Sequence, residues 1–150
     1  MYSSAIIFSF LTLDMKLLIL YCDLFEYQIS TKSIDGFNAD RESDSVKDAI
    51  VAFLQLEKED ELILKKQETK FVKQIKWAAG KNNTRKIVLH SFAHLSESKA
   101  NPLITKSFID SAEQRLKTTD YEVSQTPYGY FLNLNIKAPG HPLARLFNSY

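Results

Sequence analysis

The stretch TPYGYFLNLNIKAPGHPLARL, residues 126–146, decides how this chain folds towards its C-terminal end. Its first half alternates as a β-strand does, with one side formed by Tyr128, Tyr130, Leu132, Leu134 and Ile136. The alternation stops at Pro139-Gly140-His141-Pro142, which predicts a rigid turn. A regular strand that ends in such a corner indicates a sheet domain in which the chain turns back here.

Outward from this strand, hydrophobic patterns predict the rest of the domain. Apolar runs favour buried strands at residues 16–22, 25–31, 49–54 and 86–92, with a hairpin-like turn at Asp23-Leu24 and a loop over 34–44. Apolar residues recur at helical spacing within 59–81 and from Pro102 to about Lys117. Residues 121–124 and 128–137 are expected to pair as a hairpin. The order predicts an α/β or α+β domain with a mixed sheet and two main helices.

Composition limits the function classes. A chain of 150 residues with 45% apolar residues fits one domain with a single core. Its net charge of +1 excludes a protein that grips nucleic acid along its whole length, although a local RNA contact stays open. One cysteine and three histidines without zinc-ligand spacing indicate an intracellular, cytoplasmic protein that needs no metal.

The first 14 residues are interpreted as an N-terminal extension, with the working domain at 15–150. An apolar run covers residues 5–13, but no Lys or Arg precedes it, and Asp14 and Lys16 interrupt it well short of a membrane span. Neither secretion nor membrane insertion is therefore expected, and the extension is expected to pack little.

Few side chains stand out as chemical candidates. His94 follows a predicted strand end, where α/β sheets commonly build a site, although a structural role at a turn is the commoner fate of such a histidine. His90 is expected to pack inside a strand, and His141 to be a loop residue. Five lysines between residues 65 and 76 are typical of a solvated helix face.

Four segments together resemble the N-terminal editing domain of archaeal threonyl-tRNA synthetases. These are FAHLSESKANP (92–102), PYGYFLNLNIKAPGHPLARL (127–146), MKLLILYCDLFEY (15–27) and VAFLQLEKEDE (51–61). The resemblance implies a fold like that of D-aminoacyl-tRNA deacylases, a homodimer, and hydrolysis of serine wrongly attached to threonine tRNA. It also implies the tRNA 3′ end and a synthetase catalytic subunit as partners, with no cofactor and no metal.

The resemblance assigns residues one by one. His94 matches the pocket histidine of the family and is the expected catalytic residue, whereas Leu132 and Arg145 stand where the family has a lysine and a glutamate. We expect those two positions to act together, because an enclosed glutamate that loses its lysine partner is costly. The expected substrate-binding residues are Asp23, Ala52, Phe53, Phe92, Ala93, Tyr130, Phe131, Leu132 and Arg145.

Three interpretations follow from the sequence. The chain could still hydrolyse mischarged seryl-tRNA with His94, backbone groups and the ribose 2′-hydroxyl of the tRNA. It could instead be a degenerate, catalytically impaired editing domain that binds the tRNA acceptor end or serves as a dimerising appendage of a synthetase. It could also be an unrelated α/β domain.

Overall fold

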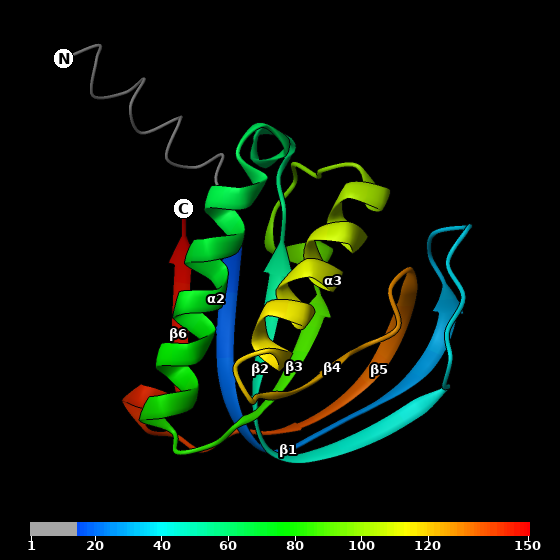
Figure 1. Ribbon diagram of the computed structural model, residues 1–150. Coiled ribbons are helices and arrows are strands. Elements are labelled where there is room, and N and C mark those ends of the chain that lie inside the picture. Colours follow the sequence, from blue (N-terminus) through cyan, green and yellow to red (C-terminus); the bar gives the residue numbers. More distant parts are fainter. Residues whose placement is uncertain (1–14) are drawn as a thin grey trace, which may run out of the picture.

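The computed structural model describes residues 15–150 (Figure 1), so the expectation that residues 1–14 pack little lies outside the described part. In this described part, six strands form one sheet: β1 (Lys16–Lys32), β2 (Ser43–Gln55), β3 (Lys86–Ser91), β4 (Glu122–Gln125), β5 (Tyr130–Lys137) and β6 (Arg145–Ser149). Within residues 15–150 the α-helices are α2 (Leu64–Lys81) and α3 (Pro102–Lys117). Short 3-10 turns lie at Lys58–Leu62, Ala93–Leu95 and Pro142–Ala144.

Strand β1 pairs with three other strands of the sheet, β2, β5 and β6. The strand order is β4-β3-β2-β1-β5, and β6 also pairs with β1. Along one edge of β1, Lys16–Leu20 pair with β6 and Leu24–Lys32 pair with β5, both antiparallel. The pairs β2–β3 and β3–β4 are parallel. The expected class, a mixed-sheet α+β domain with two main helices, is confirmed.

Helices α2 and α3 cover one face of this sheet (Figure 1). Buried residues of α2 fall at helical spacing, at Phe71, Val72, Ile75, Ala78 and Ala79, and thus form one apolar stripe. The Phe71 and Phe108 rings of the two helices meet at a centroid distance of 5.6 Å. Because both rings are buried in the main core, we expect truncation of either to alanine to cost about 3–5 kcal/mol.

The opposite face of the sheet carries a second, smaller apolar cluster. Alternation along β1 and β2 sends Ile19 and Ala52 to the helices, and Cys22 and Phe53 to the other side. The cluster consists of Cys22, Phe25, Tyr27, Ala49, Val51, Phe53 and Val88. Phe147 of β6, paired with Leu18, is 56% exposed, so this face is only partly covered.

Two predictions about strands were wrong. No turn occurs at Asp23-Leu24, because β1 runs through both residues. They lie where the strand that pairs with this edge of β1 changes from β6 to β5. The polar Asp23 therefore interrupts the apolar pattern of β1 without ending the strand. The predicted hairpin of residues 121–124 and 128–137 does not form either, because β4 pairs with β3 while β5 crosses to β1.

Candidate functional site

A cavity of about 690 Å³ opens where β3 ends, beside the first turn of α3 and the start of β5. The 3-10 turn Ala93–Leu95 and the connection from β4 to β5 form its two sides. Its lining residues are Ser33, Ile34, Gln55, His90, Ser91, Phe92, Ala93, His94, Lys99, Ala100, Asn101, Pro102, Thr105, Pro127, Tyr128, Gly129, Tyr130, Phe131, Leu132 and Leu134.

The cavity brings together six of the ten residues expected from the sequence. Phe92, Ala93 and His94 come from the turn after β3, and Tyr130, Phe131 and Leu132 come from the opening residues of β5. The two segments are more than thirty residues apart in the chain, and the crossing of β5 to β1 places them on one cavity. Lys99, Asn101, Thr105 and Tyr128 also line it, although sequence reasoning did not single them out.

The other four expected residues do not line the cavity. The Ala52 side chain is fully buried in the main core on the helix side of the sheet. Phe53 is 4% exposed and lies beneath the cavity, with its ring edge-on to Phe92 at 5.5 Å. Asp23 lies within β1, and Arg145 is exposed at the start of β6.

Leu132 and Arg145 are far apart within one chain. Leu132 pairs with Ile29 of β1, whereas Arg145 pairs with Leu20. Nine positions separate these two β1 residues, which is about 30 Å along the strand at 3.3 Å per residue. The expectation that these two positions act together is therefore not met within one chain.

The ion pair between Lys16 and the buried Glu57 holds the turn that carries His94 in place. Ser96 donates a hydrogen bond from its hydroxyl to Glu57 Oε1, and Lys16 Nζ lies 3.1 Å from Glu57 Oε2. The Glu57 side chain is only 2% exposed, so loss of either partner would leave a buried charge poorly compensated. His94 itself is exposed, with its ring 5.2 Å from that of Phe92.

His90 forms part of the cavity floor and is buried to 5% exposure. Its Nδ1 lies 2.8 Å from the hydroxyl of Thr126, and its ring packs against Phe25, Phe53 and Phe92. Burial lowers the pKa of His90 from 6.5 to about 4, so the imidazole is neutral near pH 7. The expected packing role thus includes a hydrogen bond that ties β3 to the segment before β5.

The side of the cavity that is formed by the connection from β4 to β5, here called the wall, depends on Gly129. Its φ of +87° lies in the left-handed region, and an added Cβ would stand 3.2 Å from the Ile34 carbonyl oxygen. The Gly129 carbonyl accepts hydrogen bonds from the backbone N–H groups of Ser33 and Ile34 at 2.8 and 3.1 Å. Tyr130 also donates its hydroxyl hydrogen to the Phe37 carbonyl at 3.2 Å. The wall is therefore attached to the loop that follows β1.

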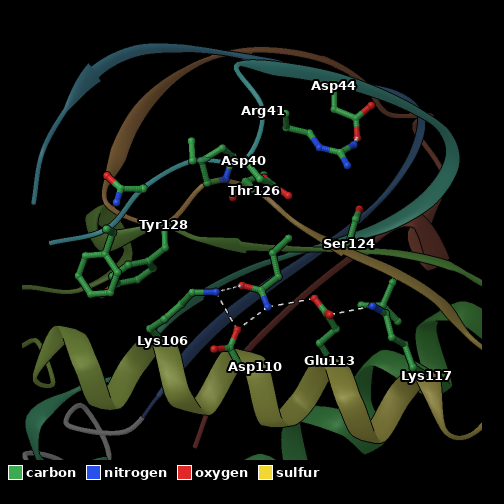
Figure 2. A pocket seen from close by; sticks show the side chains of 16 residues that line it. Asp40, Arg41, Asp44, Lys106, Asp110, Glu113, Lys117, Ser124, Thr126 and Tyr128 are labelled. Atoms are coloured by element: carbon green, nitrogen blue, oxygen red, sulfur yellow. Dashed lines mark hydrogen bonds and ion pairs between the residues drawn. The ribbon is translucent and has the colours of Figure 1, made fainter.

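A polar cleft of about 440 Å³ lies behind the same wall and shares Pro127 and Tyr128 with the cavity (Figure 2). Side chains of α3 converge there on Gln125, whose Nε2 donates to Asp110 at 2.8 Å and to Glu113 at 3.0 Å. Lys106 bonds both Asp110 and Gln125, and Lys117 pairs with Glu113. These charges satisfy one another, so the network braces the wall and leaves the cavity as the stronger candidate site.

The cavity can hold a flat aromatic group with a polar end. Tyr128, Tyr130 and Phe92 offer ring faces and edges for stacking, while His94 and Lys99 supply polar atoms at one side. Among the described residues that line it, none is a carboxylate. Residues 15–150 also hold no group of three or more side chains arranged to bind a metal ion. No helix within the same residues is long and apolar enough to cross a membrane.

Residues 15–150 match the sequence profile of a family described as the archaea-specific editing domain of threonyl-tRNA synthetase. The chain belongs to this family. The match covers the whole described part of the molecule, and the segments that form the two sides of the cavity carry the resemblance seen in the sequence. The expected family membership is confirmed, and the interpretation as an unrelated α/β domain is wrong.

Curated relatives of this editing domain are threonine–tRNA ligases of archaea. Identity is 28% over 135 residues for the enzyme of Thermococcus kodakarensis, 29% over 135 for that of Pyrococcus horikoshii, and 31% over 134 for that of Methanosphaera stadtmanae. Each alignment covers 88% of this chain but only 22% of the relative. The chain thus spans about a fifth of the length of these ligases.

A solved structure shares the fold of the editing domain at low sequence identity. The c-Myc DNA unwinding element binding protein superposes with a TM-score of 0.60 over 90% of this chain and 98% of its own, at 11% identity. At that identity the similarity shows the fold alone.

Proposed function

We propose that this editing domain binds the aminoacylated 3′ end of threonine tRNA in the cavity and hydrolyses the ester when the amino acid is serine. The observation that carries the proposal is the composition of the cavity. Its two sides come from residues 92–102 and 127–134, which are the segments that resemble the editing family. A binding surface assembled from both segments is what recognition of one nucleotide and its amino acid requires.

The terminal adenine fits the aromatic side of the cavity. Stacking on Tyr or Phe rings is worth about 1–3 kcal/mol per base, and it needs no net positive charge on the protein. This agrees with a chain whose formal charge is only +1. The amino acid ester then points towards the turn of His94, where polar atoms are available.

Hydrolysis needs a water molecule placed against the ester carbonyl. Attack forms a new C–O bond, the bond to the ribose oxygen breaks, and that oxygen takes up a proton. No carboxylate is available among the described lining residues, so His94 and the neighbouring 2′-hydroxyl of the ribose are the groups proposed to orient the water. Serine lacks one methyl group of threonine, which a pocket distinguishes only about 10- to 200-fold, so a hydrolytic site is needed.

A second candidate function is binding without hydrolysis. Leu132 favours it, because this side chain lines the cavity and packs against the smaller apolar cluster instead of offering a charge. A domain of this kind would hold the acceptor end or tether a synthetase without removing serine.

Release of serine from seryl-tRNA for threonine, with threonyl-tRNA as control substrate, distinguishes the two functions. We expect release above the spontaneous rate, loss of most of it in His94→Ala, and little change in His141→Ala, which alters an exposed histidine outside the cavity. Protection of seryl-tRNA from spontaneous hydrolysis would establish the binding function instead. Equal behaviour of both histidine variants would remove His94 from the mechanism.

The proposal includes two assemblies. We propose a homodimer through the partly covered sheet face, where exposed Phe147 lies beside Leu18 on adjacent strands. We also propose that the domain acts in the cytoplasm together with a threonyl-tRNA synthetase body, since the matching region makes up only 22% of the length of its ligase relatives.

A further inference from the structure

Helix α2 concentrates positive charge in a chain that is otherwise nearly neutral. It carries six lysines and one glutamate, whereas the whole chain has 19 basic and 18 acidic residues. The glutamate, Glu68, pairs with Arg115 of α3 at 3.0 Å and so does not neutralise a lysine of α2. The six lysines are Lys65, Lys66, Lys70, Lys73, Lys76 and Lys81.

These lysines keep their charge available at the surface. Within residues 15–150, none of the six forms an ion pair with a carboxylate. Three of them lie instead over aromatic rings: Lys70 over Tyr150 at 5.4 Å, Lys76 over Tyr121 at 6.0 Å, and Lys81 over Trp77 at 5.8 Å. Contacts of this kind position an ammonium group without cancelling its charge.

The lysines form a track on the outer side of the helix. Lys66, Lys70, Lys73, Trp77 and Lys81 follow the three- and four-residue spacing of one helical face, opposite the buried stripe. At 1.5 Å per residue the track is about 22 Å long. Trp77 lies within it and is 47% exposed. Lysines in such a line can contact successive phosphates of a nucleic acid backbone, which is the main electrostatic term in nucleic acid binding.

We propose that this lysine track of α2 binds the phosphate backbone of the tRNA acceptor stem while the 3′ end occupies the cavity; the identity of this RNA rests on the proposed function. Helices α2 and α3 lie side by side on one face of the sheet, and the first turn of α3 lines the cavity (Figure 1). Ser107, Ser111 and Gln114 of α3 are exposed and uncharged, and the exposed Asp110 is paired with Lys106 at 2.7 Å. An RNA that leaves the cavity can therefore cross α3 to the track.

The test compares two triple variants that remove the same charge. Lys66→Gln, Lys73→Gln and Lys81→Gln change exposed lysines of the track, and glutamine keeps a good helix propensity. The matched control changes three exposed lysines outside α2: Lys47→Gln, Lys86→Gln and Lys137→Gln. Binding of an uncharged threonine tRNA transcript is titrated over a range of salt concentrations, and thermal melting verifies that both variants fold.

We expect the α2 variant to bind the transcript about tenfold or more weakly, with a log–log salt slope lower by about 2–3, because each lost phosphate contact removes about 0.7–0.9 from it. The control should stay within about twofold of the wild type. Wild-type affinity of the α2 variant, or an equal loss in the control, would overturn the proposal. Loss of binding to phosphatidylserine vesicles with unchanged tRNA binding would assign the track to lipid and overturn it as well.

A short seryl-oligonucleotide that contains only the unpaired 3′ end separates this proposal from the proposed function. Such a substrate reaches the cavity but not α2, so the α2 variant should handle it as the wild type does. If the wild type neither binds nor hydrolyses it, the cavity assignment fails, while the tRNA titration still decides the lysine track. A defect of the α2 variant on this short substrate would show that the lysines act through the cavity, against the proposal.

Discussion

At the scale of single residues, His90 makes the stability of the domain depend on pH. Its pKa falls to about 4 in the folded state from 6.5, because burial disfavours the charged ring. Below pH 6.5 His90 of the unfolded chain binds a proton, whereas His90 of the folded chain binds it only near pH 4. The contribution of neutral His90 to the free energy of unfolding is therefore complete above pH 6.5, and it is lost as the pH falls towards 4.

Urea unfolding at pH 7.5 and pH 4.5 measures this effect. We expect the wild type to lose about 2–3 kcal/mol more between these conditions than His90→Gln does, since one pKa unit corresponds to about 1.4 kcal/mol. His141→Gln, which changes an exposed histidine, should follow the wild type. An identical pH response of wild type and His90→Gln would mean that His90 titrates normally in the folded protein.

The separation of Leu132 and Arg145 leads to a second prediction at this scale. Leu132→Lys is expected to raise seryl-tRNA hydrolysis about tenfold, the scale of one positioned polar group, at some cost in stability. Arg145→Glu should add nothing to either effect in one protomer, because the two positions pair with β1 residues nine apart. The double variant should thus equal the sum of the singles within about 0.5 kcal/mol.

Hydrolysis rates and unfolding free energies of the two single variants and the double variant test this additivity. A marked gain in rate when Arg145→Glu is added to Leu132→Lys would show that the two side chains do meet, which would require the second copy of a dimer.

At the scale of elements, the wall between β4 and β5 depends on one glycine. Gly129→Ala should destabilise the domain by about 1–3 kcal/mol, because alanine is strained at a φ of +87° and its Cβ would press on the Ile34 carbonyl. Gly140→Ala is the control, since an added Cβ there meets nothing within 4 Å. Chemical denaturation measures both. Equal stability of the two variants would show that the wall adjusts without cost.

The sequence predicts where helices and strands lie better than it predicts which strands pair with each other. Helical spacing located α2 and α3, since the apolar stripe of a helix is written locally at residues such as Phe71 and Ile75. Strand alternation gives faces but not partners, so nothing local to residues 121–137 shows that β5 skips β4 and pairs with β1. Strand β6 was also missed, because its five residues follow a Pro-Gly corner and form a strand only against β1.

The candidate site shows the same limit. Family resemblance placed Phe92 to His94 and Tyr130 to Leu132, and the cavity brings them together. It could not show that Ala52 faces the core, since that depends on which side of β2 the helices cover. Thr126 as the partner of His90 was equally hidden, because 36 residues separate them.

At the scale of the whole molecule, the partly covered sheet face predicts dimerisation. Phe147→Glu would place a charge beside Leu18 on this face, so it should convert a dimer to monomer at micromolar concentration. Leu103→Glu changes a leucine that is 72% exposed on α3, and it should leave assembly unchanged. Size-exclusion chromatography with light scattering measures both. A monomeric wild type would contradict the proposed dimer.

The double pairing of β1 also sets the order in which the domain can be completed during translation. This strand is among the first described segments to leave the ribosome. One of its edges nevertheless stays unpaired until residues 130–149 have been synthesised, because that edge pairs with β5 and β6, and Lys16 pairs with Ser149. At about 5–20 residues per second, an unpaired apolar edge persists for about 6–30 s of synthesis. During that interval the nascent chain is open to strand exchange with a neighbouring nascent chain or to capture by a chaperone.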